Sequence, residues 1–267
     1  MKICNNRYLN TFILLGLLLP LTALLYLAPV DALPVCGTIT KSTYNFAGCT
    51  GGTLTIGASN INFGCKSGAV ITATGAYGIL INLQSNVTVF GCKVTGATQA
   101  GFEIIGGNDN SLTDNTATND YAGFEVGSTG NTLAGNIATG NKGYGGFALL
   151  GGMNNTLVKN TATSNVWGFI IDNSASDVLS GNTATSNTYY GIWAINQYSR
   201  PYSTITDNTA NTNNVGFYFD NSTSGNIVVG NAATGNTVFN ADSVGPNNFH
   251  TSLNPGIKTP YTGLQSP

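Results

Sequence analysis

The stretch from Asn155 to Asp172 reads NTLVKNTATSNVWGFIID, and its landmarks recur along most of the chain. One landmark is a glycine followed by a large apolar residue, as in Gly168-Phe169. The full series is Gly78-Ile79, Gly101-Phe102, Gly123-Phe124, Gly146-Phe147, Gly168-Phe169, Gly191-Ile192 and Gly216-Phe217, with spacings of 23, 22, 23, 22, 23 and 25 residues. A period of this length indicates a solenoid, a propeller or another repeat array.

Three further series keep step with the glycines. An asparagine recurs at Asn115, Asn136, Asn160, Asn182, Asn208 and Asn231, with Cys92 in the same slot. An alanine follows two residues later at Ala117, Ala138, Ala162, Ala184, Ala210 and Ala233. An aliphatic residue precedes at Val89, Leu112, Leu133, Leu157, Leu179, Ile205 and Val228. Anchors that stay in register over about seven periods indicate that each period is one structural unit.

Each period contains short stretches with apolar residues on alternate positions, as in Gly123–Val126, and none with helical periodicity. Asn, Gly, Asp and Ser fill the intervals, as in turns. The sequence therefore predicts an all-β parallel β-helix of about 8 coils of 22–25 residues. In it the phenylalanines form a column in the core, and each buried asparagine hydrogen-bonds to its counterpart in the next coil.

The composition limits the classes of partner. Only 7% of the residues are charged and 42% are hydrophobic, so the chain can bury a core. The net charge of −2 argues against nucleic acid, which needs a basic surface.

The first 32 residues are expected to be an export signal. Lys2 and Arg7 flank an apolar run, Phe12–Ala28, and cleavage is expected after Ala32. An uncleaved membrane anchor is the alternative. After it we expect a cap with the first coils at 33–77, regular repeats at 78–245 and a tail at 246–267. Four cysteines remain beyond the signal, which favours two disulfides over four buried thiols in an exported chain.

The repeats resemble those of right-handed parallel β-helix proteins of the pectate-lyase superfold, and most closely the exported NosD-like group. The segment 36–75, CGTITKSTYNFAGCTGGTLTIGASNINFGCKSGAVITATG, resembles the cysteine-bounded opening coils of that group, and the resemblance covers roughly residues 36–240. It implies disulfides Cys65–Cys92 and Cys36–Cys49. The usual Asn-Gly-His of the group is Lys66-Ser67-Gly68 here. Copper handling finds no support in a chain with one His and two Met, so no cofactor is expected.

Glu103 and Glu125 are the candidate catalytic residues. Both stand two residues after the repeat glycine, which places them outward in adjacent coils, about 5 Å apart. Such a pair could divide acid and base roles or hold calcium. A solvated pair of like charges is the alternative.

The same outward column continues as Ala148, Ile170, Trp193 and Tyr218. The longest coil adds a loop containing Tyr198, Arg200 and Tyr202. Exposed aromatic rings beside an arginine are suited to stacking on sugars, so Trp193, Tyr218 and these three residues are the candidate ligand-binding set. Ordinary packing of aromatic side chains on a parallel sheet is the alternative.

Two functions follow. The first is a secreted, cell-surface or periplasmic β-helix without catalytic activity that binds a polysaccharide or another cell-envelope component. The second is a polysaccharide lyase, hydrolase or epimerase that uses Glu103 and Glu125. The scarcity of Arg, Lys and His favours the first.

Overall fold

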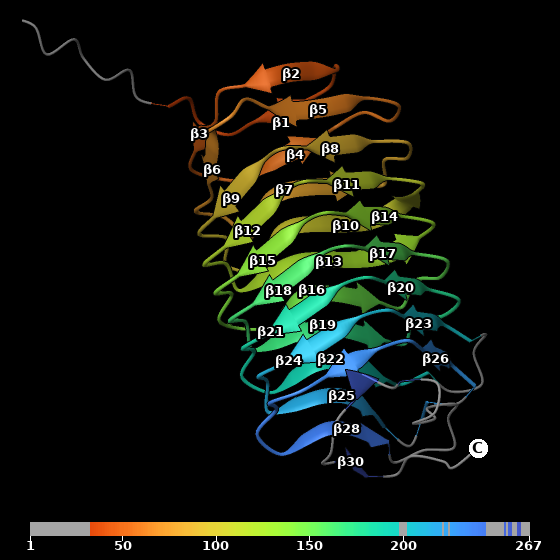
Figure 1. Ribbon diagram of the computed structural model, residues 1–267. Helices are drawn as coiled ribbons and strands as arrows, with labels where there is room; N and C mark the ends of the chain where they lie inside the picture. Colours follow the sequence, from red (N-terminus) through yellow and green to blue (C-terminus); the bar gives the residue numbers. More distant parts are fainter. Residues whose placement is uncertain are drawn as a thin grey trace, which may run out of the picture. The chain divides into compact units, whose positions relative to one another are not determined.

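The computed structural model describes residues 33–197, 202–220, 222–223, 225–243, 254, 256–257 and 261–262, and the export signal expected at residues 1–32 lies outside this range. The described strands form three parallel sheets that wind around one core (Figure 1). In each turn the chain passes through one strand of each sheet before it returns to the first. This is the expected right-handed parallel β-helix. Within the described ranges there is no helix long and apolar enough to cross a membrane.

The first sheet has 11 strands: β1 (Thr38–Ile39), β4 (Leu54–Ile56), β7 (Tyr77–Asn82), β10 (Ala100–Asn108), β13 (Ala122–Thr129), β16 (Gly145–Leu150), β19 (Trp167–Asp172), β22 (Tyr190–Ile195), β25 (Val215–Phe219), β28 (Phe239–Ser243) and β30 (Tyr261–Thr262). The second has nine: β2 (Thr43–Phe46), β5 (Asn62–Cys65), β8 (Thr88–Phe90), β11 (Ser111–Thr113), β14 (Thr132–Ala134), β17 (Thr156–Val158), β20 (Val178–Ser180), β23 (Thr204–Thr206) and β26 (Ile227–Val229). The third has ten: β3 (Cys49–Thr50), β6 (Val70–Thr72), β9 (Lys93–Thr95), β12 (Thr116–Thr118), β15 (Ile137–Thr139), β18 (Thr161–Thr163), β21 (Thr183–Thr185), β24 (Thr209–Asn211), β27 (Ala232–Ala233) and β29 (Gly256–Ile257).

The phenylalanine column lies in the core, as predicted. Phe102, Phe124, Phe147 and Phe169 are fully buried, and successive rings are parallel with centroids 4.6, 4.8 and 4.9 Å apart. This separation equals the distance between neighbouring strands, so the backbone pairing fixes the ring stacking. Ile79 and Ile192 continue the column at its two ends.

The repeat glycine fills a corner in which no side chain fits. A Cβ atom on Gly146 would lie 2.8 Å from the amide nitrogen of Asn165, 2.9 Å from the carbonyl oxygen of Gly168 and 3.0 Å from the methyl group of Ala162. The repeated glycine, alanine and asparagine of the sequence therefore meet at one crowded corner of each coil.

Buried asparagines link the coils at all three corners, where the sequence had indicated one ladder. The backbone N–H of Asn160 donates to Oδ1 of Asn182 at 2.9 Å, and its Nδ2 donates to the same oxygen and to the Leu133 carbonyl at 2.8 Å. The predicted ladder runs through Asn115, Asn136, Asn160, Asn182, Asn208, Asn231 and Asn254. A second runs through Asp120, Asn141, Asn165, Asn187, Asn213 and Asn236, and a third through Asn110, Asn131, Asn155, Asp177, Ser203 and Asn226. These bonds satisfy polar groups that lie inside the fold.

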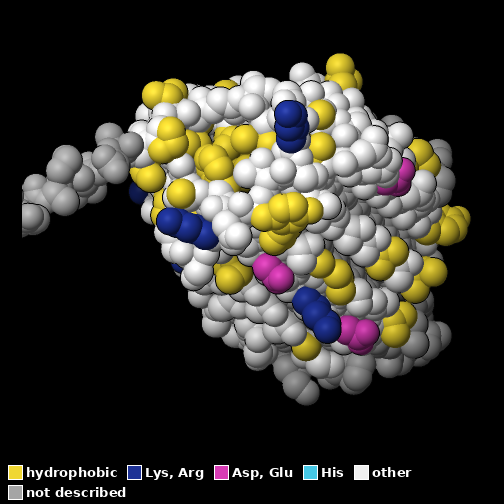
Figure 2. Space-filling model, turned by 90° about the horizontal axis from the view of Figure 1, so that it is seen from above, with side chains coloured by type: hydrophobic (Ala, Val, Ile, Leu, Met, Phe, Trp, Pro, Cys, Tyr) yellow, Lys and Arg dark blue, Asp and Glu magenta, His cyan; other side chains and the backbone are white. Residues whose placement is uncertain are grey.

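Both predicted disulfides are present at the N-terminal end of the stack. Cys36 bonds to Cys49 and Cys65 bonds to Cys92. The backbone N–H of Cys92 donates to Oδ1 of Asn115 at 3.0 Å, so this cysteine stands at the start of the predicted ladder. Figure 2 looks down on this end, where charged side chains are few and scattered among hydrophobic and uncharged polar ones.

Asp120 breaks the pattern of its ladder. Its Oδ1 accepts from the Ala97 N–H at 2.7 Å, as an asparagine oxygen would. Its Oδ2 is buried without a partner and lies beside Gly101, in the position that the amide nitrogen of Asn165 takes beside Gly146. Burial raises the pKa of Asp120 to about 7, against the lowering effect of N–H donors from Ala97, Thr118 and Gly96.

Phe147→Ala should destabilise the protein by about 3 to 5 kcal/mol, because the stacked coils cannot collapse into the space of the missing ring. Ile137→Ala removes a side chain that is 43% exposed and should cost less than about 1 kcal/mol. Chemical denaturation of the two variants measures both costs. Equal losses would contradict the division between inside and outside described above.

Asp120→Asn should stabilise the protein above neutral pH, because it supplies the missing N–H donor and removes a buried charge. The pKa of Asp120 is raised in the folded state, so its contribution is complete below the ordinary value of 3.8 and is lost as the pH rises to about 7. We expect a gain of roughly 2 to 4 kcal/mol at pH 8 and little gain at pH 4. Urea denaturation at the two pH values checks this, and an equal gain at both would contradict the titration.

Candidate functional site

The outer surface of the first sheet carries two neighbouring columns of side chains. A Cβ atom on the repeat glycine would point into the crowded corner, whereas the residue before the glycine and the residue two places after it lie outside the core cluster. The sequence had predicted only the column after the glycine. In that column Glu103 pairs with Glu125, Ala148 with Ile170, and Trp193 with Ile170 and Tyr218.

The column before the glycine supplies further aromatic residues, namely Tyr77, Trp167 and Tyr190. It escaped the sequence analysis because its other members, such as Ala100, Ala122 and Gly145, are small. The signal was nevertheless present, since all three aromatic residues directly precede a repeat glycine.

The aromatic residues Trp167, Tyr190, Trp193 and Tyr218 of the two columns, together with Tyr144 just before β16, form what we call the aromatic face. The ring of Trp167 contacts Tyr144 edge-on at 5.3 Å and Trp193 at 5.6 Å between centroids. Tyr190 lies 5.0 Å from Trp193 and stacks on Tyr218 at 4.9 Å. The rings are half-buried, so each keeps accessible surface while its neighbours hold it in place.

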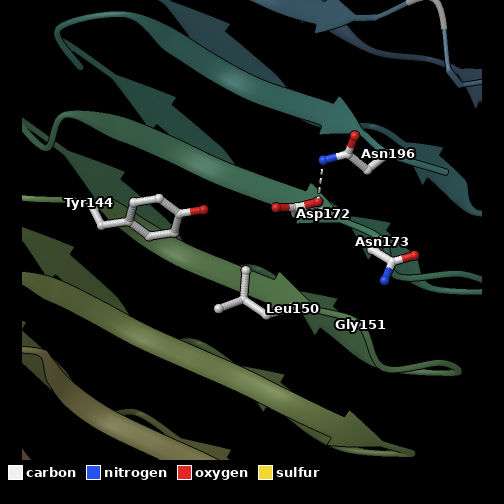
Figure 3. A pocket seen from close by; sticks show the side chains of 6 residues that line it. All are labelled: Tyr144, Leu150, Gly151, Asp172, Asn173 and Asn196. Atoms are coloured by element: carbon white, nitrogen blue, oxygen red, sulfur yellow. Dashed lines mark hydrogen bonds between the residues drawn. The ribbon is translucent and has the colours of Figure 1, made fainter.

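A cleft of about 700 Å³ adjoins the aromatic face where β16, β19 and β22 end. Its lining residues are Tyr144, Leu150, Gly151, Asp172, Asn173 and Asn196. Figure 3 shows the hydroxyl end of Tyr144 and the carboxylate of Asp172 turned toward the same space above Leu150. Nδ2 of Asn196 donates to Oδ1 of Asp172 at 2.8 Å and fixes the orientation of the carboxylate.

Glu103 and Glu125 are neighbours in register, but the alternative of a solvated pair does not hold for Glu103. Its side chain is only 7% exposed and its Oε2 is buried without a hydrogen-bond partner. Burial, a hydrogen bond to Glu125 and the charge of Glu125 raise the pKa of Glu103 well above its usual range. Burial also raises the pKa of Glu125. The pair therefore tends to retain a proton to higher pH than separate carboxyl groups would, and a proton between them reduces their repulsion.

Carboxylates lie close enough to the tyrosines of this surface to raise the pKa values of their hydroxyl groups. Burial, Asp172 and Glu125 raise the pKa of Tyr144, and burial and Asp242 raise the pKa of Tyr190. Burial, Tyr190 and the carboxylates of Asp242 and Asp220 raise the pKa of Tyr218. The aromatic face is thus edged by negative charge.

The loop residues predicted for this site are not found beside the aromatic face in the described part of the chain. Tyr198 and Arg200 lie outside the described residues. Tyr202 is 62% exposed, and its ring lies over Gly225 of the following coil. None of the ring contacts found in the described chain includes Tyr202, so the structure does not bring it together with Trp193 and Tyr218.

Comparison with known proteins identifies the relatives of this chain. A family model described as periplasmic copper-binding protein (NosD) matches residues 39–201 and 107–263. No curated protein sequence matches. The fold is similar to that of a rhamnogalacturonan lyase, with a TM-score of 0.64 and 15% identity over 87% of this chain and 77% of the lyase. It is also similar to the periplasmic alginate epimerase AlgG, with a TM-score of 0.47 and 17% identity over 77% of this chain and 48% of the epimerase.

The described residues do not fit copper, which the family description names. Copper sites use thiolate, thioether or imidazole ligands. The four cysteines of the described chain are in disulfides, and no group of three or more His, Cys, Asp or Glu side chains occurs among the residues placed here. Calcium, which the sequence allowed at Glu103 and Glu125, takes six to eight oxygen ligands, whereas no group of three or more His, Cys, Asp or Glu side chains that could hold a metal occurs among the described residues.

Glu103→Gln should flatten the pH dependence of stability, because glutamine keeps a donor toward Glu125 but cannot ionise. The pKa of Glu103 is raised in the folded state, so its stabilising contribution is complete below the ordinary value of 4.5 and falls as the pH rises to about 9. The variant should therefore be more stable than the parent at pH 8 to 9. Thermal unfolding between pH 5 and 9 measures the effect.

Asp207→Asn provides the matched control, since Asp207 is an exposed carboxylate in a turn. It should leave the pH profile of the parent unchanged. If Glu103→Gln keeps the pH dependence of stability seen in the parent, Glu103 does not hold the shared proton.

Proposed function

Because this chain belongs to the NosD family of β-helix proteins, and because its first sheet presents an aromatic face beside a cleft, we propose that it binds carbohydrate outside the cytoplasm. The compartment is the periplasm or the cell surface. The two disulfides support an oxidising compartment, and the family description names the periplasm.

The aromatic face carries this proposal. Flat rings stack on the C–H surfaces of sugars, and large aromatic side chains dominate contact energies. Here five rings follow one another across the coils without an intervening charge, so several sugar units of a chain could lie along them. The cleft of about 700 Å³ has the volume of an ordinary small-ligand site and adds polar groups from Asp172, Asn173 and Asn196.

A polysaccharide lyase, hydrolase or epimerase is the second candidate, and the raised pKa of Glu103 favours it. Two observations weigh against it. Glu103 is only 7% exposed and its Oε2 is buried, so this carboxyl has little access to a substrate. In addition, none of the described lysines lies in a strand of the first sheet, where one would neutralise an acidic substrate.

Trp193→Ala should weaken glycan binding at least tenfold, because this ring contacts both Trp167 and Tyr190 at the centre of the aromatic face. A glycan array identifies the ligand, and calorimetry with that ligand measures the loss. Tyr44→Ala removes a ring that is 58% exposed on the second sheet and should bind as the parent does.

Product analysis on the bound polymer tests the enzyme alternative. Under the binding proposal the polymer stays intact, and Glu103→Gln and Glu125→Gln bind as the parent does. If the parent cleaves or epimerises the polymer, and if either glutamine variant loses this activity but still binds, the protein is an enzyme and the binding proposal is wrong. A protein that binds no glycan on the array would refute both.

A further inference from the structure

The aromatic face and its cleft combine rings with negative charge, and this combination restricts the ligand. Asp172 lines the cleft, and Asp242 lies next to Tyr218 in its column. The pair formed by Glu103 and Glu125 lies in the same column, on the other side of Ala148. A carboxylate therefore stands at each end of the aromatic face and at its side.

Positive charge is missing from the same surface in the described part of the chain. The described lysines are Lys41, Lys66, Lys93, Lys142 and Lys159. Only Lys93 lies in a strand, and that strand, β9, belongs to the third sheet. Lys142 is exposed in the turn before β16 and is the nearest of them in sequence to the aromatic face. With the described residues alone, an acidic polysaccharide would meet like charge here with little compensation.

A further observation points to a ligand that carries positive charge. In the cleft, Asn196 engages only Oδ1 of Asp172, so the other oxygen of this carboxylate remains for a ligand. Indole and phenol rings attract ammonium groups over their faces, and the attraction adds to that of a nearby carboxylate.

We propose that this surface recognises a glycan that bears free, protonated amino groups, such as a chain of unacetylated glucosamine units. The sugar rings stack along Trp167, Trp193 and Tyr218, while an ammonium group reaches Asp172 in the cleft. This inference rests on the proposed carbohydrate binding and adds the charge of the ligand to it.

The experiment compares four probes by calorimetry on the full chain at pH 6: glucosamine oligomers, their fully N-acetylated counterparts, galacturonate oligomers and oligolysine. The amino sugar should bind at least tenfold more tightly than the acetylated one. The galacturonate oligomer and oligolysine should bind weakest, since the first is repelled and the second lacks sugar rings. Added salt should weaken binding of the amino sugar and leave the acetylated sugar unaffected.

Asp172→Asn removes the charge and keeps an oxygen for Asn196 to donate to. This substitution should weaken binding of the amino sugar about five- to tenfold and leave binding of the acetylated sugar unchanged. Asp114→Asn makes the same change at an exposed turn residue and should have no effect.

The other outcomes overturn the inference in distinguishable ways. Equal binding of the two sugars, with Asp172→Asn silent, leaves carbohydrate binding in place and refutes the charge selectivity. If the galacturonate oligomer binds most tightly, the surface prefers negative rather than positive ligands and the inference is wrong. If oligolysine binds as tightly as the amino sugar, sugar rings are not needed for binding. No binding of any probe, with a glycan array also blank, refutes this inference and the proposed function together.

Discussion

The hydrogen bonds between asparagines of successive coils are the constraint on which the rest of this structure depends. A β-helix must turn three times per coil, and each turn places backbone N–H and C=O groups where water cannot reach them. An asparagine at the corner accepts from the coil on one side and donates to the coil on the other, as Asn160 does between Asn136 and Asn182. Because this solution is electrically neutral, the fold needs few charges, which accounts for a chain with only 7% charged residues.

Fixed corners leave the outward side chains free to vary, and the functional surface arises there. Inward positions must repeat, because each phenylalanine of the stack has its neighbours only 4.6 to 4.9 Å away. Outward positions have no such requirement, so the same column holds Glu125 in one coil and Trp193 three coils later. The turn at the repeat glycine adds a second outward column beside the first. That addition makes a surface wide enough for a ring such as Trp167 to rest against Trp193.

Sequence reasoning recovered the repeating parts of the molecule and missed what does not repeat. The period, the phenylalanine stack, one asparagine ladder and the register of Glu103 with Glu125 followed from regular spacing. The cleft did not, because Leu150, Asp172 and Asn196 are not marked by any repeat. The burial of Glu103 was also missed, since strand alternation tells which way a side chain faces but not whether its neighbours cover it. The sequence indicated one ladder of three, because Asp120, Asp177 and Ser203 interrupt the others.

The ladders also bear on how such a chain can change its length in evolution. Each coil meets its neighbours through the same set of bonds, so a duplicated or deleted segment of one period restores every column in register. A few extra residues are absorbed in the turns, as the coil lengths of 22 to 25 residues show, but a longer segment that is not a whole period would put asparagines opposite apolar residues and open the core. Tandem duplication of whole coils is therefore the tolerated path, and it lengthens the outer surface by one row of side chains at a time. A lineage could in this way adjust the span of its binding surface to a longer or shorter polymer without redesigning the interior.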